Sequence, residues 1–561
     1  MCNAWTVYRQ WIEKTSAYPD LYRELLSLKE QPDAIQERFG RDLAFGTGGL
    51  RGVMGAGTNR MNLLTVSRAS QGCAAWLLGF RKNPTAAVAY DTRRGSDEFA
   101  RHAAAVLAAN GISVWLFPHP MPTPALSFAI RDLACDGGIV ITASHNPAQY
   151  NGYKVYQADG CQITSADAKA IQRKIEAADP FAGVEAGAFE EGIRRGRIRW
   201  IPESVTERYL KAVGTTALLP DTVPRNLSIV YTPLNGTGIF CVPRCLRENG
   251  FSEIIIPEEQ RNPDGNFPTC PVPNPEVRDA LEVGIRLMER TGSELLLATD
   301  PDCDRVGAVV RDGDRARMLN GNELGLLLFD FICTRRRENG TMPERPLAFK
   351  TIVTVPLADR IAERYGVELR DTLTGFKYIG EQISLLEKRG EADRFVFGFE
   401  ESCGYLSGSY VRDKDGVNAA LLTCEMTVYY KDQGRTLAEV LEELYREYGY
   451  QTNRQKSIRF EGPDGAEKMA ALMERLRHRT PESLAGVPVV RILDYLRDDQ
   501  TGLPKSNVLR FLLQDGSEAA VRPSGTEPKL KIYLTAAGET KDDSERLAER
   551  LEMECASWAA G

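Results

Sequence analysis

The sequence lacks an uninterrupted apolar run long enough to span a membrane. A transmembrane helix needs about 20 predominantly apolar residues, whereas the stretch ELGLLLFDFICT (residues 323–334) is shorter and contains Asp330. The opening segment MCNAWTVYRQWIEKT carries charges where a signal peptide would have its apolar core. We therefore expect a cytoplasmic protein without a membrane partner.

The chain also lacks a CxxC pair and an excess of positive charge. Its 12 cysteines are dispersed, so they are expected to be mostly reduced core residues. The formal net charge is −7. This charge argues against a nucleic acid or an anionic membrane as the main partner, because both require a basic surface.

Length and composition predict a folded protein with several domains. A chain of 561 residues exceeds what one hydrophobic core supports, and about 100 to 200 residues per domain gives three to five domains. Hydrophobic and charged residues make up 43% and 26% of the chain, as in ordinary globular proteins. Clefts between domains are therefore expected.

The pattern of apolar runs predicts repeated α/β units. Residues 1–40 show helical spacing, which indicates a leading helical segment. Strand, helix and strand then follow one another three times. The three sets are AAVAYD, EFARHAAAVLAANG and SVWLFP; LSIVYT, CVPRCLRENG and EIII; RPLAFKTIV, LADRIAERYG and ELRDTL. The predicted fold is α/β, with three related mixed α/β domains and a smaller α+β C-terminal domain around a central cleft.

The domain boundaries are predicted from this rhythm. The four domains are expected to cover residues 1–210, 211–325, 326–450 and 451–561. Proline-rich or polar stretches near residues 220, 340 and 450 are candidate linkers.

Ser144 is the first candidate functional residue. It follows GGIVITA, which predicts a buried strand, and it begins the polar loop SHNP, where functional groups concentrate. A turn or helix-capping serine is the alternative. A serine hydrolase is disfavoured, because Ser144 lacks the flanking glycines of a G-x-S-x-G elbow.

Three aspartates form the second candidate site, after the predicted strand ELLLA. In ATDPDCDRVG, Asp300, Asp302 and Asp304 occupy alternating positions, and their mutual repulsion favours a bound cation. Oxygen ligands suit Mg²⁺, which keeps positions open for a phosphate oxygen. A solvated acidic turn is the alternative. An EF-hand is excluded, because Arg305 and Arg311 stand where it requires Gly and Glu.

Two further loops offer groups for a phosphorylated sugar, with exposed turns as the alternative for both. VRPSGTEPKLKIY supplies a guanidinium, hydroxyls and a backbone freed by glycine, which suit a phosphate dianion; the residues are Arg522, Ser524, Gly525 and Thr526. GFEESCGY places Glu400 and Ser402 after the predicted strand RFVF, at a spacing that suits neighbouring sugar hydroxyls. Lys377, Arg412 and Lys414 could add positive charge there.

Arg51 lies in the glycine-rich stretch FGTGGLRG. The stretch fails as a dinucleotide-binding fingerprint, because Arg51 stands where the third glycine is required. A turn that presents Arg51 to an anion is the functional interpretation, and a purely structural turn is the alternative.

Together, TASHNP, DPDCDR, GFEES and RPSGTEP, in this order and at these separations, resemble the α-D-phosphohexomutase superfamily over nearly the whole chain. FGTGGLRG, GFEESCGY and TLTGFKYIG are most similar to the phosphoglucomutase type-2 branch, which includes bacterial α-phosphoglucomutases and phosphopentomutases. One departure is TPLNGTG, where relatives typically read TPLHGTG. Asn235 therefore replaces a histidine beside the expected metal loop.

The resemblance implies a role for each candidate. Ser144 would carry a phosphoryl group and, with Asp300, Asp302 and Asp304, bind one Mg²⁺. Sugar hydroxyls would be read by Glu400 and Ser402, near Lys377 and Lys414. The non-reacting phosphate would lie on Arg522, Ser524, Gly525 and Thr526. Arg51, Lys154 and Arg305 would compensate the negative charge of the phosphoryl group at Ser144. His145 or Lys154 would move the proton of the attacking hydroxyl.

The implied activity is a phosphoglucomutase of carbohydrate metabolism, an isomerase that interconverts glucose 1-phosphate and glucose 6-phosphate. It would act through a phosphoserine enzyme and glucose 1,6-bisphosphate, which would serve as intermediate and activator. A phosphopentomutase or a phosphomannomutase is the alternative within the same class, and a metal-dependent sugar phosphatase or a non-catalytic sugar-phosphate sensor belongs to other classes. The expected partners are sugar phosphates, without nucleic acid, and the chain is expected to be a monomer or homodimer.

Overall fold

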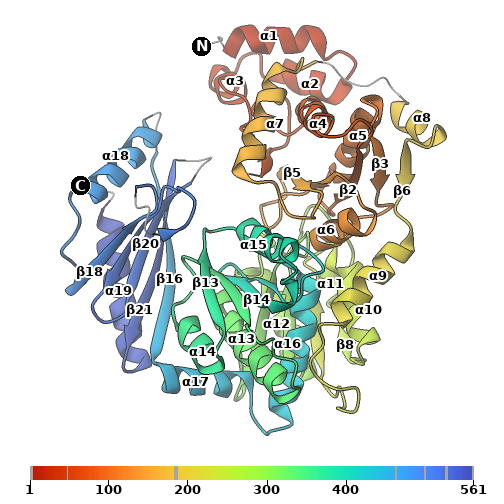
Figure 1. Ribbon diagram of the computed structural model, residues 1–561. Coiled ribbons are helices and arrows are strands. Elements are labelled where there is room, and N and C mark those ends of the chain that lie inside the picture. Colours follow the sequence, from red (N-terminus) through yellow and green to blue (C-terminus); the bar gives the residue numbers. More distant parts are fainter. Residues whose placement is uncertain are drawn as a thin grey trace.

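A computed structural model describes residues 4–46, 48–181, 187–461, 464–497, 501–524 and 528–558. Four sheets, each with its own helices, follow one another along the chain (Figure 1). The first domain, red to yellow, lies at the top of the view and the last domain, blue, lies at the left. The two middle domains lie below the first domain and to the right of the last. The predicted α/β fold with four domains is confirmed.

The first domain is built on a six-stranded mixed sheet in the order β1-β5-β4-β2-β3-β6. Three short helices precede the sheet where the sequence predicts one helical segment: α1 (Ala4–Lys14), α2 (Pro19–Ser27) and α3 (Pro32–Phe39). The next elements are β1 (Gly49–Val53), α4 (Leu63–Leu77), β2 (Thr85–Tyr90), α5 (Ser96–Ala109), β3 (Ser113–Leu116), α6 (Thr123–Asp132), β4 (Gly137–Ile141) and β5 (Tyr150–Gln157). They are followed by α7 (Ser165–Ala177), α8 (Ala188–Arg194), β6 (Ile198–Trp200) and α9 (Glu203–Gly214).

The second domain has a five-stranded mixed sheet in the order β11-β10-β9-β7-β8. Its elements are β7 (Ile229–Thr232), α10 (Gly238–Glu248), β8 (Ile254–Ile255), α11 (Glu258–Arg261), α12 (Arg278–Thr291), β9 (Leu295–Thr299), β10 (Val306–Asp312) and β11 (Arg315–Leu319).

The third domain has a four-stranded mixed sheet in the order β13-β12-β14-β15. Its elements are α13 (Gly321–Glu338), β12 (Leu347–Thr351), α14 (Leu357–Tyr365), β13 (Glu368–Thr372), α15 (Phe376–Lys388), β14 (Phe395–Glu400), β15 (Gly404–Leu406), α16 (Gly416–Lys431) and α17 (Leu437–Tyr448).

The fourth domain has a six-stranded antiparallel sheet in the order β16-β21-β20-β19-β18-β17. Its elements are β16 (Tyr450–Arg459), α18 (Gly465–His478), β17 (Ser483–Leu484), β18 (Val487–Asp494), β19 (Leu509–Leu513), β20 (Glu518–Pro523), β21 (Lys529–Gly538) and α19 (Lys541–Ser557). The predicted α+β C-terminal domain is confirmed.

The three predicted strand-helix-strand units are confirmed as parallel pairs. β2 pairs with β3, β7 with β8, and β12 with β13, and in each case one helix connects the two strands. In all three mixed sheets a buried strand is also followed directly by an antiparallel neighbour: β4 by β5, β9 by β10 and β14 by β15. The connecting loops of these three pairs therefore occupy equivalent positions in the three domains.

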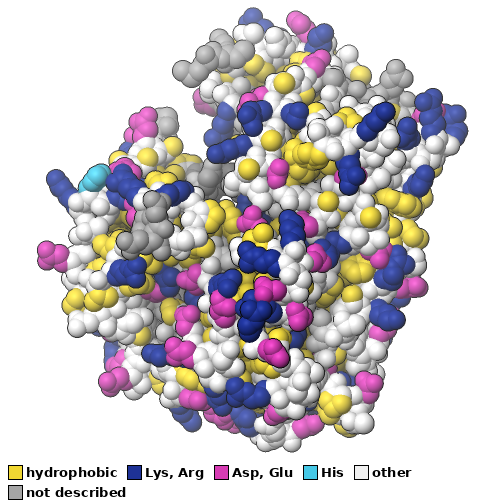
Figure 2. Space-filling model, viewed as in Figure 1, with side chains coloured by type: hydrophobic (Ala, Val, Ile, Leu, Met, Phe, Trp, Pro, Cys, Tyr) yellow, Lys and Arg dark blue, Asp and Glu magenta, His cyan; other side chains and the backbone are white. Residues whose placement is uncertain are grey.

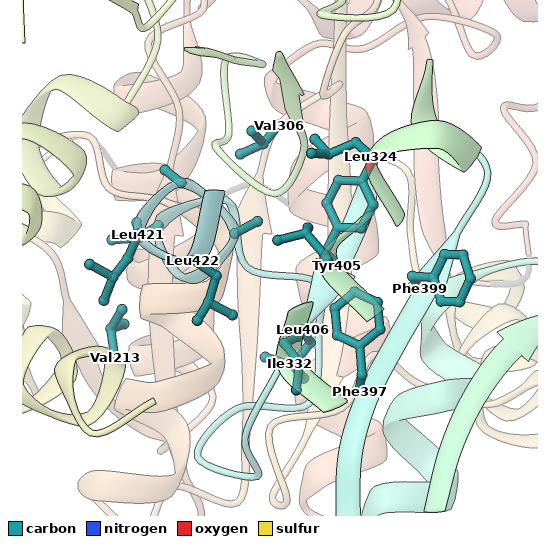
Figure 3. Packing of buried hydrophobic residues seen from close by; sticks show 14 of the residues in the cluster. Val213, Val306, Leu324, Ile332, Phe397, Phe399, Tyr405, Leu406, Leu421 and Leu422 are labelled. Atoms are coloured by element: carbon teal, nitrogen blue, oxygen red, sulfur yellow. The ribbon is translucent and has the colours of Figure 1, made fainter. Parts of the chain in front are cut away.

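A shared hydrophobic core fixes the middle domains to each other and to the helix α9. Figure 3 shows side chains of these parts packed together, among them Val213 of α9, Val306 of β10, Phe397 of β14 and Leu421 of α16. The last domain has a separate core. The first domain has a core of its own on one face of its sheet, whereas residues on the other face, such as Ala89 and Val140, belong to the shared core. The eleven cysteines in the described ranges are free and buried, as predicted. No helix of the described part of the chain combines the length and the apolar character needed to cross a bilayer.

Three local predictions are wrong. Arg51 lies on the strand β1 and not in a turn. The arginine run near residue 340 belongs to α13, which continues to Glu338, so this part of the stretch is not a linker. The polar stretch near residue 450 forms β16, which pairs with β21 along its whole length.

Candidate functional site

The three equivalent loops meet at one place. Ser144 lies in the loop after β4, the three aspartates lie in the loop after β9, and Glu400 ends β14 at the start of the third loop. Each loop contains one non-glycine residue with a positive φ angle: Ser144 (51°), Cys303 (51°) and Cys403 (60°). Such left-handed backbone is uncommon outside glycine and is concentrated at functional sites.

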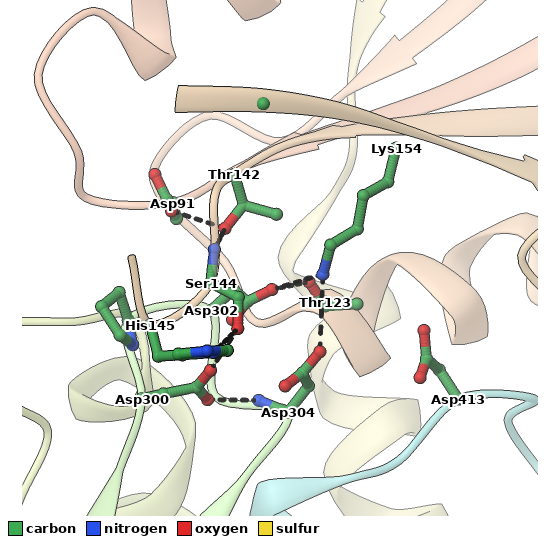
Figure 4. A network of polar contacts seen from close by, with 12 residues as sticks. Asp91, Thr123, Thr142, Ser144, His145, Lys154, Asp300, Asp302, Asp304 and Asp413 are labelled. Carbon is green, nitrogen blue, oxygen red and sulfur yellow. Dashed lines mark hydrogen bonds and ion pairs between the residues drawn. The ribbon is translucent and has the colours of Figure 1, made fainter. Parts of the chain in front are cut away.

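The Ser144 side chain connects the first domain to the aspartate loop of the second domain, which is the candidate metal site. Its Oγ donates to Asp300 Oδ2 at 2.7 Å and lies 3.1 Å from His145 Nδ1 (Figure 4). Only 3% of Ser144 is exposed. A buried hydroxyl between an imidazole and a carboxylate is therefore present where the sequence predicts the reacting serine.

A buried network holds the Ser144 loop in place. Thr142 Oγ1 accepts from the Ser144 amide at 2.8 Å and donates to Asp91 Oδ2 at 2.6 Å. The guanidinium of Arg93 donates to the carbonyl oxygens of Ser144 and Asn146, and to those of two further loop residues, Pro147 and Tyr150. Asp91 and Arg93 are themselves buried and form an ion pair at 3.3 Å. One arginine thus fixes four carbonyl groups of the loop.

The three aspartates fit a divalent cation. They are buried, and one ligand oxygen from each lies within 4.8 Å of the others. Asp302 Oδ1 and Asp304 Oδ1 are buried and accept no hydrogen bond from any residue that the structure describes. Burial, together with the charges of Asp302 and Asp304, raises the pKa of Asp300. Unpartnered oxygens on closely spaced carboxylates are the donor set that Mg²⁺ prefers.

Two lysines from other domains contact the same aspartates. Lys154 of β5 lies 2.9 Å from Asp302 Oδ2 and 3.5 Å from Asp304 Oδ2. Lys414 lies 2.7 Å from Asp304 Oδ2 and 3.4 Å from Asp413. Burial alone would lower the pKa of Lys154, but the charges of Asp302 and Asp304 raise it. The site therefore brings together groups from the first three domains.

The remaining groups around Ser144 are less buried: His145 and Arg305 are half-buried, and Arg51 is exposed. Burial, followed by the charges of Arg305 and Arg51, lowers the pKa of His145 well below its usual range. Arg51 Nη1 donates to Asn146 Oδ1 at 3.0 Å, and Arg305 Nη1 donates to Glu276 Oε2 at 3.2 Å. Ser144 is thus surrounded by the other four predicted catalytic residues, which contact the Ser144 loop or the aspartates.

The sugar-loop candidate lies beside the aspartates. Glu400 is buried, and burial raises its pKa, whereas the nearby charges of Lys414 and Arg305 lower it. Ser402 is half-buried in the same loop. Lys377, the second residue of α15, has its pKa lowered to about 8, mainly by burial and in part by the charge of Arg522.

The last domain contributes the fourth loop. Arg522 is the penultimate residue of the strand β20, and the Ser524 amide donates to the Lys529 carbonyl at 2.7 Å. Gly525 and Thr526 lie outside the described residues. Figure 2 shows the molecule hollowed between the lobe of the first domain and that of the last. The electrostatic effect of Arg522 on Lys377 shows that this end of β20 faces the third domain.

Asn235 does not contact the aspartates. Its side-chain nitrogen donates to the carbonyls of Glu259 and Asn262, at 3.3 and 2.8 Å. Contact with the metal loop comes from Thr237, whose amide and hydroxyl both donate to the Pro301 carbonyl. Thr237 therefore provides contact to the metal loop that does not depend on residue 235.

Comparison with known proteins gives the family. Models of the phosphoglucomutase/phosphomannomutase domains I, II and III and of the C-terminal domain match residues 42–181, 207–313, 320–448 and 458–554. The chain belongs to the phosphoglucomutase/phosphomannomutase family, and hence to the α-D-phosphohexomutase superfamily that its motifs resemble.

The sequences of individual phosphoglucomutases align with most of this family member's length. The phosphoglucomutase of Staphylococcus haemolyticus is 36% identical over 90% of this chain and 92% of its own. That of Staphylococcus aureus strain MRSA252 is 36% identical over 92% and 93%. A solved phosphoglucomutase/phosphomannomutase family protein from Burkholderia thailandensis has a TM-score of 0.69 at 18% identity, over 92% of this chain and 98% of that one, which shows the shared fold.

Several residues of this family member's site have no place in the sequence prediction. Their hydrogen bonds and ion pairs hold the loops of the site in position. These residues are Asp91, Arg93, Thr123, Thr142, Glu276 and Asp413. A signal for one of them exists, because Asp91 follows a buried strand directly, as Asp300 does. Arg93 acts through hydrogen bonds to main-chain carbonyl groups, and no pattern in the sequence predicts such contacts.

Proposed function

We propose that this enzyme interconverts glucose 1-phosphate and glucose 6-phosphate, with Ser144 as the phosphorylated residue. The observation that carries the proposal is the 2.7 Å contact between Ser144 Oγ and Asp300 Oδ2 across two domains. Relatives named phosphoglucomutase support the choice of substrate. The phosphoryl group would be lent to the free hydroxyl of the bound sugar phosphate, giving glucose 1,6-bisphosphate. That intermediate would then turn end for end and return its other phosphoryl group to Ser144.

Asp300, Asp302, Asp304 and Ser144 would hold one Mg²⁺ per chain. When bound, the ion supplies positive charge for the equatorial oxygens of the transferred phosphoryl group. Arg51, Arg305 and Lys154 add charge on the same side, and phosphoryl transfer depends on such compensation more than on covalent assistance. The identity of the proton carrier is proposed from distance: His145 Nδ1 is 3.1 Å from Ser144 Oγ, whereas Lys154 is held by Asp302.

The groups assigned to the substrate follow the same proposal. Glu400 and Ser402 would accept and donate hydrogen bonds to sugar hydroxyls, with Lys377 and Lys414 beside them. Arg522, Ser524, Gly525 and Thr526 would hold the phosphate that does not react. The burial of Ser144 favours a mutase over a phosphatase, because a phosphatase must admit water to the phosphoserine.

Replacement of Ser144 by alanine tests the proposal. We expect the wild-type enzyme to carry one phosphate by intact-mass measurement and Ser144→Ala to carry none and to lose turnover of glucose 1-phosphate. Turnover of ribose 1-phosphate and mannose 1-phosphate measured in parallel identifies the preferred sugar. A Ser144→Ala variant with near-normal rates would refute the assignment of Ser144. Release of inorganic phosphate at the rate of turnover would instead support a phosphatase.

A further inference from the structure

Lys531 forms an unusual pair of like charges with Arg522. The two residues are directly opposite each other on the antiparallel strands β20 and β21. Directly opposed residues have Cβ atoms about 5 Å apart and side chains on the same face, and like charges in such a pair destabilise the sheet. Both side chains are half-buried. A pair of this kind is stabilised when an anion lies against both cations.

Strand alternation directs Lys531 away from the core of its own domain. Its neighbours Leu530 and Ile532 are fully buried in the core of the last domain. Tyr533, two positions further along β21, instead packs against Ile352 and Leu373 of the third domain. Since residues two apart share a face, Lys531 lies on the face of the sheet that meets the third domain.

Charged groups of the second, third and fourth domains act on Lys531. Burial, Arg522 and Arg305 lower its pKa, and Glu401 of the third domain opposes them. Its charge in turn helps to lower the pKa of His145 in the first domain. Lys531 is therefore paired with Arg522 across the strands and close enough to the Ser144 loop to affect His145 electrostatically.

Glu401 neutralises the positive charge of Lys531 and Arg522 only in part. Its Oε2 accepts from Thr351 Oγ1 at 3.1 Å, so part of its hydrogen-bonding capacity is already used within the third domain. Burial and the charge of Glu400 raise the pKa of Glu401 to about 7, so its ionised form is disfavoured there. The surroundings of Lys531 and Arg522 therefore keep an excess of positive charge.

We propose that Lys531 retains the bisphosphate intermediate while it turns, by contacting a phosphate that has left one end of the cleft and has not yet reached the other. A lysine is suited to this role, because its ammonium is a compact charge on a flexible four-carbon stem and needs no fixed bidentate geometry. The inference rests on the proposed function. If the bisphosphate leaves during the turn, it takes the phosphoryl group along, and Ser144 remains as a free hydroxyl until external bisphosphate restores it.

Replacement of Lys531 by glutamine separates retention from catalysis. The rate of glucose 1-phosphate turnover is measured against added glucose 1,6-bisphosphate, and bisphosphate released from phosphorylated enzyme is quantified. We expect Lys531→Gln to need about tenfold more bisphosphate for half-maximal rate, since one charge-assisted contact is lost. The rate at saturating bisphosphate should stay within about twofold of wild type, because the transfer step is unchanged.

Two matched variants complete the experiment. Lys531→Arg keeps the charge and should restore most of the retention. Lys456→Gln removes a lysine from the neighbouring strand β16, where it pairs with Glu552 on the α19 side, and should behave as wild type. Wild-type dependence on bisphosphate in Lys531→Gln would overturn the inference, as would a change confined to the KM for glucose 1-phosphate. If the wild-type enzyme neither carries phosphate nor converts glucose 1-phosphate, the proposed function fails first.

Discussion

Ser144 adopts a left-handed backbone conformation that a serine rarely takes. Such a conformation costs about 1 to 2 kcal/mol for a residue with a side chain. The contacts of Arg93 with four loop carbonyls offset this cost, since hydrogen bonds from a charged donor are about twice as strong as neutral ones. The main chain of the loop is therefore fixed in the conformation that directs the buried Ser144 hydroxyl toward Asp300.

Lys377 should give the enzyme a falling activity at alkaline pH. Its pKa is lowered to about 8, so the side chain is cationic below that pH and neutral above it. If Lys377 attracts a substrate phosphate, kcat/KM for glucose 1-phosphate should fall as the pH rises through about 8, to about a tenth one pH unit further on if the neutral form is inactive. Lys377→Arg stays charged over this range and should remove the fall. An identical alkaline limb in both proteins would assign it to another group.

The reacting residues can be predicted from the sequence, whereas the residues that hold them in position cannot. Ser144 and Asp300 are polar groups directly after runs of buried β-branched or aliphatic residues, which is an unusual and readable pattern. Arg93 acts through main-chain carbonyls, and a sequence does not show which carbonyls a side chain will reach. Glu276 is brought to Arg305 by folding over 29 positions of separation.

At the scale of elements, burial decides which strands can be predicted. β4 and β9 are buried along their whole length, so they appear in the sequence as nearly continuous runs of small and apolar residues. β16 has only half-buried and exposed residues, and β1 is rich in glycine. These two strands lie at the edges of their sheets and lack the apolar pattern, which is why the sequence assigns them to a linker and a turn.

Helix α16 should be sensitive to any side chain at its first residue. The Gly416 amide donates to the Cys303 carbonyl, and a Cβ at Gly416 would lie 2.6 Å from that oxygen. Gly416→Ala must therefore displace either the helix or the metal loop, at a cost of about 1 to 3 kcal/mol. We expect reduced resistance to urea and a smaller thermal shift on addition of Mg²⁺.

Gly214→Ala is the matched control for that change. It also adds a methyl group to a helical glycine, in α9, but the nearest atoms would be 3.4 to 3.9 Å away on the side chain of Asn249, which is ordinary contact. We expect stability and the Mg²⁺ response to match wild type. Equal losses in the two variants would show that the Gly416 effect does not come from the contact with Cys303.

At the scale of the whole molecule, an arginine pair ties the third domain to the first. The sequence suggests Arg412 as positive charge for substrate, but its side chain is fully buried and contacts Glu387 of α15 at 2.7 Å. Glu387 also binds Arg131 of α6 at 2.7 Å, and Arg131 donates to the Asp159 carbonyl. The position of Ser144 relative to Glu400 depends on such ties, because the two residues belong to these two domains.

Glu387→Gln should loosen the contact between the first and third domains at neutral pH. The hydrogen bond from Arg131, followed by the charge of Arg412, lowers the pKa of Glu387 to about 2, although burial opposes them. Glu387 is partly exposed, so solvent screening limits the loss to about 1 to 2 kcal/mol, including the unpaired charge left on buried Arg412. Because unfolding of four domains is not two-state, hydrogen exchange of residues 157–162 and of α15 is the suitable measurement.

The pH dependence of this loss follows from the direction of the shift. A carboxylate whose pKa is lower in the folded protein stabilises it fully above the unfolded pKa of about 4.3, and the contribution disappears as the pH falls toward the folded pKa. The difference in exchange between wild type and Glu387→Gln should therefore be constant from pH 7 to about pH 5 and shrink below about pH 4. Glu363→Gln, which removes an exposed glutamate paired with Arg360 on the same helix, should leave these segments unchanged. A difference that persists undiminished below the unfolded pKa would mean that Glu387 acts through packing, and the electrostatic tie between the domains would be refuted.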